Sequence, residues 1–134
     1  MASILRVNTL TDASSNNSVP IATVASGSAK AIGTIDTDTD NSIDFSFNIA
    51  SYTDRATGSL YGNFTNNMGS ATGYTVLGSP SPVAPGTMNT TNSNRSIICS
   101  ADTAARFSSN GFSDSDNSKQ DLHCHSNAVY GDLA

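Results

Sequence analysis

The sequence contains no Glu and no Trp, and charged residues make up only 13% of its 134 residues. Helix formers with long polar side chains are scarce, since there are two Lys, four Arg, one Gln and no Glu. The chain instead has 22 Ser, 15 Thr and 14 Asn. Their short polar side chains bond nearby backbone groups in non-helical conformations. This composition predicts an all-β or loop-rich fold.

Basic residues are too few and too scattered for a nucleic-acid-binding protein. The chain has six Lys and Arg against 11 Asp, which gives a net charge of -5. Phosphate binding needs clustered positive charge. No run of 18 apolar residues occurs, so we predict no membrane span. Cys99 and Cys124 allow one disulfide. The sequence leaves their pairing open, although a chain made in the cytosol usually keeps its thiols reduced.

The sequence lacks the local signatures of common enzymes. It has no Gly-x-Ser-x-Gly, no Gly-rich phosphate loop and no His-Glu-x-x-His. The acidic run 36–44 resembles the start of a calcium loop, but Asn41 replaces the turn Gly and Phe47 replaces the final acid. We therefore expect a solvated loop there, no cofactor and no enzymatic activity.

The segment His123-Cys124-His125 is the strongest metal candidate. On a strand, His123 and His125 point to one face and Cys124 to the other. Two imidazoles are too few for a site, but three chains around a threefold axis would supply six, which suits an octahedral transition metal. His123 and His125 are the predicted ligands of such a site. The interpretation that we favour is an ordinary polar strand face that carries both His residues, with Cys124 pointing inward.

Alternating apolar and polar residues at 43–50 give the clearest strand signal. A turn at 54–58 and an aromatic-rich run at 59–65 complete a hairpin. Further strands are expected at 74–78, 95–101 and 122–130, so residues 31–134 are predicted to form a small antiparallel β-sandwich or barrel. The expected core residues are Ile43, Phe45, Phe47, Ile49, Leu60, Phe64, Ile97 and Leu122.

Residues 1–30 have a different pattern, with short apolar pieces around a polar, turn-prone stretch. Such a segment cannot bury enough apolar surface to offset its ordering entropy. We predict an extended N-terminal attachment arm that orders on another chain. The chain has few large apolar residues from which to build a core, with nine aromatic residues and no Trp. This shortage favours an oligomer whose subunits share a core.

Several stretches, in the expected order, resemble tail-fibre-like virion proteins of marine and freshwater bacteriophages, notably of the cyanophage type. They are residues 1–18 continuing to 29–31, residues 47–65 with Met68 and 73–76, and residues 129–134, and these three stretches together span about half of the chain. The hairpin at 47–65 has the Thr-Asp turn ending in Gly, followed by the Asn-Phe-Thr strand, that is usual in this family. Two departures are Ile32-Gly33, where relatives tend to have Trp, and residues 83–94, which match nothing in the family.

The resemblance implies a homotrimeric structural protein of the virion, made in the host cytoplasm. The expected function is a tail fibre for host attachment, anchored to other phage proteins through residues 1–25. In that interpretation the loops at 79–94 and 108–119, with Tyr52, Tyr61 or Tyr74, contact a glycan of the host surface. One alternative is a trimeric capsid decoration protein, a cement or head-fibre protein whose arm lies across capsid subunits by β-augmentation. Another is a free carbohydrate-binding module.

Overall fold

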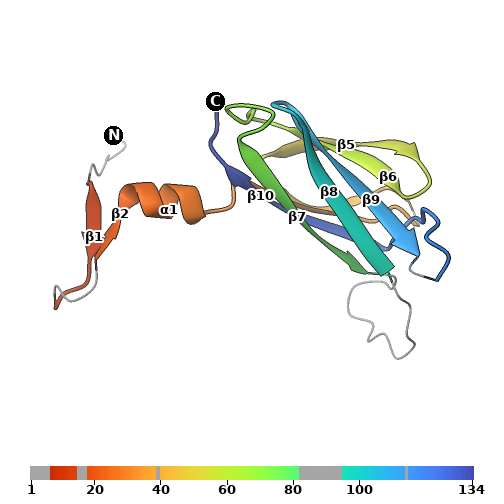
Figure 1. Cartoon of the computed structure of the whole chain (residues 1–134), viewed down its shortest axis with the longest axis horizontal. Coiled ribbons are helices and arrows are strands. Elements are labelled where there is room, and N and C mark those ends of the chain that lie inside the picture. Colours follow the sequence, from red (N-terminus) through yellow and green to blue (C-terminus); the bar gives the residue numbers. More distant parts are fainter. Residues whose placement is uncertain (1–6, 15–17, 39, 82–94, 114) are drawn as a thin grey trace.

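The computed structural model describes residues 7–14, 18–38, 40–81, 95–113 and 115–134. A sandwich of two β-sheets follows a small N-terminal unit that stands apart from it (Figure 1). The predicted all-β class is confirmed, and the described residues include one short helix. In the part of the chain that the structure describes, no helix has the length and apolarity needed to cross a membrane.

Each sheet of the sandwich has four antiparallel strands. The first sheet has the order β4-β3-β10-β7, with β3 at Ala31–Ile35, β4 at Ile43–Phe47, β7 at Tyr74–Ser81 and β10 at Cys124–Gly131. The second sheet has the order β5-β6-β9-β8, with β5 at Ile49–Ala56, β6 at Ser59–Phe64, β8 at Arg95–Thr103 and β9 at Arg106–Ser113.

The predicted hairpin is formed by β5 and β6. Its loop is shorter than expected, because Ala56 pairs with Ser59 and leaves only Thr57 and Gly58 between the strands. Gly58 has a φ of 66°, which favours glycine, and a side chain there would meet the backbone of Gln120. Strand β9 is not predicted by the sequence, because most of its residues are polar or Gly and Phe107 is the one large apolar side chain on its inward side.

The core lies between the two sheets. Three aromatic rings form its centre, with ring centroids 5.6 Å apart for Phe64 and Tyr74 and 5.7 Å apart for Phe64 and Phe107. The predictions for Ile49, Leu60, Phe64 and Leu122 are confirmed, and Ile97 is half-buried. The buried apolar cluster consists of Ala31, Ile49, Phe64, Met68, Tyr74, Val76, Phe107 and Val129.

The core prediction is wrong for Ile43, Phe45 and Phe47, which are exposed by 42, 55 and 54%. The physical reason is Asn48, which follows β4 with a φ of 55°. This left-handed residue turns the chain from the first sheet into the second, and asparagine tolerates the conformation better than most residues. Its side chain secures the turn by donating to the carbonyl of Lys30 and accepting from the amide N–H of Asn66. Ile49 therefore enters the core while Phe47, two residues earlier, faces outward.

The N-terminal unit is a hairpin followed by a helix. Strands β1 (Thr9–Thr11) and β2 (Ser18–Pro20) pair antiparallel, and α1 (Ile21–Gly27) follows directly. The prediction of an extended arm did not anticipate this helix. The amide N–H of Ile21 donates to the carbonyl of Asn8 at 2.9 Å, which ties the helix to the hairpin. None of the residues in β1, β2 or α1 is buried.

Candidate functional site

The outer face of the first sheet, here called the apolar face, is defined by two rows of side chains that cross all four strands. Strand pairing fixes the rows, since directly paired residues point to the same side of a sheet. A hydrogen bond of 3.2 Å between the hydroxyls of Thr34 and Ser126 agrees with this placement. The rows are Phe47, Ile32, Ala128 and Leu77, and Phe45, Thr34, Ser126 and Ser79.

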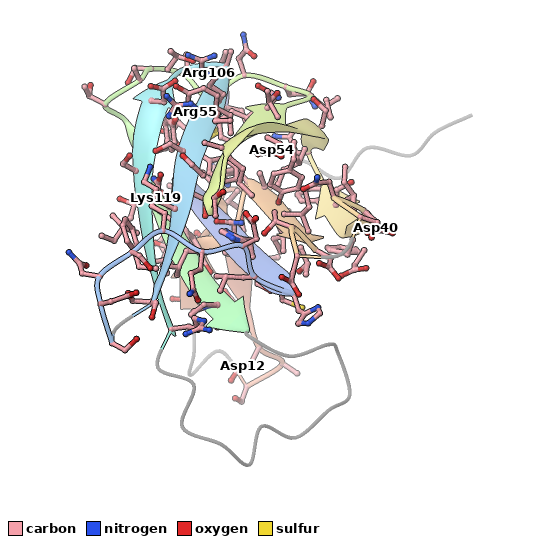
Figure 2. The ribbon with its side chains drawn as sticks, turned by 90° about the vertical axis from the view of Figure 1, so that its right-hand side faces the viewer. Asp12, Asp40, Asp54, Arg55, Arg106 and Lys119 are labelled. Atoms are coloured by element: carbon pink, nitrogen blue, oxygen red, sulfur yellow. The ribbon has the colours of Figure 1, made fainter. Side chains whose placement is uncertain are left out.

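The outer face of the second sheet, here called the polar face, is built around Tyr61. The guanidinium carbons of Arg55 and Arg106 lie 4.5 and 3.9 Å from the centre of the Tyr61 ring. Figure 2 shows these two arginines together at one end of the sandwich. Arg106 also pairs with Asp102, at 2.5 Å between Nε and Oδ2. This arrangement is a cation–π stack held open to solvent.

Amide and hydroxyl groups surround Tyr61 on the polar face. The side-chain amide of Asn63 donates to the hydroxyls of Ser51 and Thr53, at 3.1 and 2.9 Å. The hydroxyls of Ser100 and Ser108 lie 2.8 Å apart. Hydroxyls and amides beside an aromatic ring are the groups that bind a polar ligand such as a sugar.

The three tyrosines predicted to contact a glycan lie in different environments. Tyr61 is half-buried on the polar face, whereas Tyr52 and Tyr74 point into the sandwich. Tyr52 lies above Gly33, and burial raises the pKa of its phenol. The predicted glycan contact remains a prediction, and Tyr61 alone of the three is placed to make it. The part of the predicted contact loop from 82 to 94 lies outside the described residues.

Tyr74 has a structural role, because its hydroxyl contacts the backbone of a neighbouring turn. Its hydroxyl lies 2.8 Å from the carbonyl oxygen of Thr103 and 2.5 Å from that of Arg106, and it accepts from the amide N–H of Asp102 at 3.1 Å. These contacts tie β7 to the turn between β8 and β9. Burial also raises the pKa of Tyr74.

We expect Tyr74→Phe to lower the free energy of unfolding by about 1–2 kcal/mol, because backbone groups lose their partner in a largely buried site. Urea denaturation followed by circular dichroism measures the change. Tyr61→Phe is the matched control and should change stability by less than about 0.5 kcal/mol, since Tyr61 is only half-buried, on the polar face. Equal effects of the two substitutions would show that the Tyr74 hydroxyl does not stabilise this turn.

Two motifs that are distant in the sequence meet next to β10. His123 lies between Asp36 and Asp38, with its Nδ1 3.5 Å and its Nε2 3.1 Å from their carboxylate oxygens. Thr37 holds the acidic loop in place, because its hydroxyl accepts from the amide N–H of Leu122 at 2.9 Å. Within the described ranges, no three His, Cys, Asp or Glu side chains are arranged to hold a metal ion.

His125 lies inside the sandwich with none of its surface exposed. Its Nδ1 is 3.2 Å from the hydroxyl of Ser109, and its Nε2 has no hydrogen-bond partner among the described residues. Burial lowers the pKa of His125 to about 4, so the imidazole is neutral at pH 7. His123 and His125 thus have different partners. The threefold metal site remains a prediction, and the burial of His125 within one subunit argues against it.

Both cysteines are free thiols, and burial raises the pKa of each. Cys99 points between the sheets, where its sulfur lies 3.5 Å from the hydroxyl of Ser109 and 3.3 Å from the amide oxygen of Asn127. Cys124 begins β10 and is 9% exposed. These surroundings are those of structural rather than reactive thiols.

No protein-family model, no curated protein and no solved structure matches this chain.

Proposed function

We propose that this protein is a structural component of a bacteriophage virion, a trimeric tail fibre for host attachment that is anchored through its N-terminal segment. Its role is structural rather than catalytic, and it needs no cofactor. The resemblance of residues 1–18 and 47–65 to tail-fibre-like virion proteins led to this hypothesis. The observation that supports it best is the exposed N-terminal unit.

The N-terminal unit displays apolar side chains that the described part of the subunit leaves partly exposed. Leu10 and Val19 are paired across the β1–β2 hairpin and are 48 and 41% exposed, and Val24 of α1 is 43% exposed. A two-stranded hairpin is marginally stable at best on its own in water. Packing these side chains on another virion protein would offset the entropy lost when the segment orders.

The sandwich supplies the second half of the proposal. Its polar face presents Tyr61, Asn63 and the surrounding hydroxyls to solvent, on a scaffold held by the core described above. Binding groups on a rigid β-scaffold, joined to an anchoring segment, suit a protein that contacts a host-surface glycan.

Deleting residues 1–25 is expected to abolish incorporation of the protein into phage particles, because the deletion removes the hairpin and most of α1. The sandwich should stay folded, since its core contains no residue from this segment. Mass spectrometry of purified particles measures incorporation, and circular dichroism of the purified protein measures folding.

A milder variant tests the same contact. Leu10→Ser combined with Val19→Ser should reduce incorporation, whereas Ile98→Ser, which removes a 58% exposed apolar side chain from the polar face, should not. Normal incorporation of the truncated chain would overturn the role of the N-terminal unit.

The alternative to a tail fibre is a capsid decoration protein of the same virion, because an anchoring segment and a trimeric β-module suit that role equally. The number of copies per particle separates the two positions. A free carbohydrate-binding module would be absent from washed particles.

A further inference from the structure

The apolar face carries large apolar side chains that are exposed to solvent. Phe45, Phe47 and Leu77 are more than half exposed, at 55, 54 and 57%, and Ile32 is 38% exposed. The row from Phe47 to Leu77 crosses four strands, a distance of about 15 Å at the usual strand spacing. Apolar patches of a few hundred Å² on a protein surface often mark a site of contact with another molecule.

The size of this surface fits a contact between proteins. A phenylalanine side chain buries about 200 Å² when covered, so the four exposed side chains leave roughly 300 Å² of apolar area in water. A standard interface buries about 800 Å² per partner, of which just over half is apolar. The apolar face therefore supplies a large part of what one stable contact needs, and the Ser and Thr side chains of the second row add to it.

The same face has projections and a hollow. Phe45 and Phe47 project from the edge strand β4, whereas Ser126 and Ala128 on β10 are small. The small residues leave a hollow of about 260 Å³ between Ile32 and Leu77. An apolar cavity of about 150 Å³ accepts a benzene ring, so the hollow has room for a phenyl group. In the structure neither ring lines the hollow, whose walls come from β3, β7 and β10.

The distribution of charged residues favours a second copy of this chain as the partner that covers the apolar face. The net charge of -5 makes copies repel one another in general. Neither row of the apolar face contains a charged residue, whereas the polar face carries Arg55, Arg106 and Asp102. Of the two outer faces of the sandwich, the apolar face therefore brings two copies together at the lower electrostatic cost.

We propose that the apolar face is the contact between subunits, with Phe45 and Phe47 of one copy entering the hollow between Ile32 and Leu77 of the next. The projections and the hollow are separate patches, as a head-to-tail contact requires, and such contacts close into rings when the rotation allows. This inference rests on the proposed trimer and names the surface that forms it.

The test is the mass of the full-length chain in solution, measured by sedimentation velocity. The unmodified protein is expected to sediment as three chains of 13.8 kDa. Phe45→Thr combined with Phe47→Thr should sediment as a single chain, because threonine keeps the preference for a strand but removes the rings. Ile98→Thr is the matched control, since it removes an apolar side chain of equal exposure from the polar face, and it should keep the trimer.

A second variant tests the hollow. Ala128→Asp places a charge in it and should also give single chains. Mixing this variant with the double phenylalanine variant should give a two-chain complex, because each retains the half of the contact that the other lacks. Circular dichroism must show that both variants are folded. Trimers from both folded variants would overturn the proposed contact.

The outcomes distinguish this inference from the proposed function. An unmodified chain that sediments as a monomer removes both the trimer and its contact. Variants that dissociate, with a protein that is absent from phage particles, uphold the contact and reject the virion role. A trimer that only deletion of residues 1–25 dissociates places the contact in the N-terminal unit and overturns the inference.

Discussion

Phe107→Ala is expected to lower the free energy of unfolding by about 3–5 kcal/mol, the usual cost of removing a fully buried phenylalanine. Phe107 has none of its surface exposed and lies at the centre of the core. Its ring packs edge-on to Tyr52, with centroids 6.3 Å apart, and contacts the ring of Phe64. It also occupies the space above Gly62, where a Cβ would lie 2.2 Å from the ring. Neighbouring side chains on two sheets cannot collapse fully into the cavity that alanine would leave.

Phe112→Ala is the matched control for this prediction. Phe112 lies on the same strand, on the outer side, and is only half-buried. Its replacement should cost about 1 kcal/mol or less. Urea denaturation at one chain concentration compares the two variants, because assembly makes apparent stability depend on concentration. Similar losses for both variants would mean that the aromatic centre is not the main source of stability.

Lowering the pH from 7 to 4 should cost the fold about 3 kcal/mol through His125 alone. The pKa of His125 is about 4 in the folded chain and 6.5 as the ordinary value, and burial is the main cause of the difference. Between these two values the unfolded chain binds the proton and the folded chain does not. Protons therefore favour the unfolded state, and stability falls as the pH falls through this range.

The measurement is the free energy of unfolding at pH 7, 6, 5 and 4. Glutamine at position 125 cannot take up a proton. In His125→Gln the free energy of unfolding should therefore fall by about 3 kcal/mol less between pH 7 and pH 4, even if the variant is less stable at pH 7. His123→Gln leaves the buried imidazole in place and is the control that should retain the decline. Parallel pH profiles for the unmodified protein and His125→Gln would contradict the assignment.

Local signals predicted the parts of the fold in which neighbouring residues decide the structure. The hairpin of β5 and β6 follows from alternating side chains on either side of a Gly-containing turn. Ile49, Leu60 and Phe64 are buried as expected, because they are the large apolar residues of those strands. The all-β class follows from the shortage of helix formers.

Other features depend on a single backbone dihedral angle or on distant pairing. Alternation at 43–49 could not show that Asn48 reverses the side on which the next residue lies, so Phe45 and Phe47 were assigned to the core. Period two correctly separates Cys124 from His125, but it cannot say which side of β10 is the interior. That side is fixed by pairing with β3 and β7, which are distant in sequence.

The candidate site shows the same limit. The acidic run at 36–38 and His123 were identified separately, and their contact depends on the antiparallel pairing of β3 with β10. The placement of Tyr61 between Arg55 and Arg106 likewise requires the register of β5, β6 and β9. Short sequence patterns indicate which residues are able to bind, but strand order decides which of them meet.

The most direct test of the account is the number of copies of this protein in washed, purified phage particles, measured by quantitative mass spectrometry against the major capsid protein. The account predicts that the protein is present in a few to a few tens of copies, as expected for trimers attached to the tail. Hundreds of copies would place it on the capsid as a decoration protein. Its absence from the particles would contradict the proposed function.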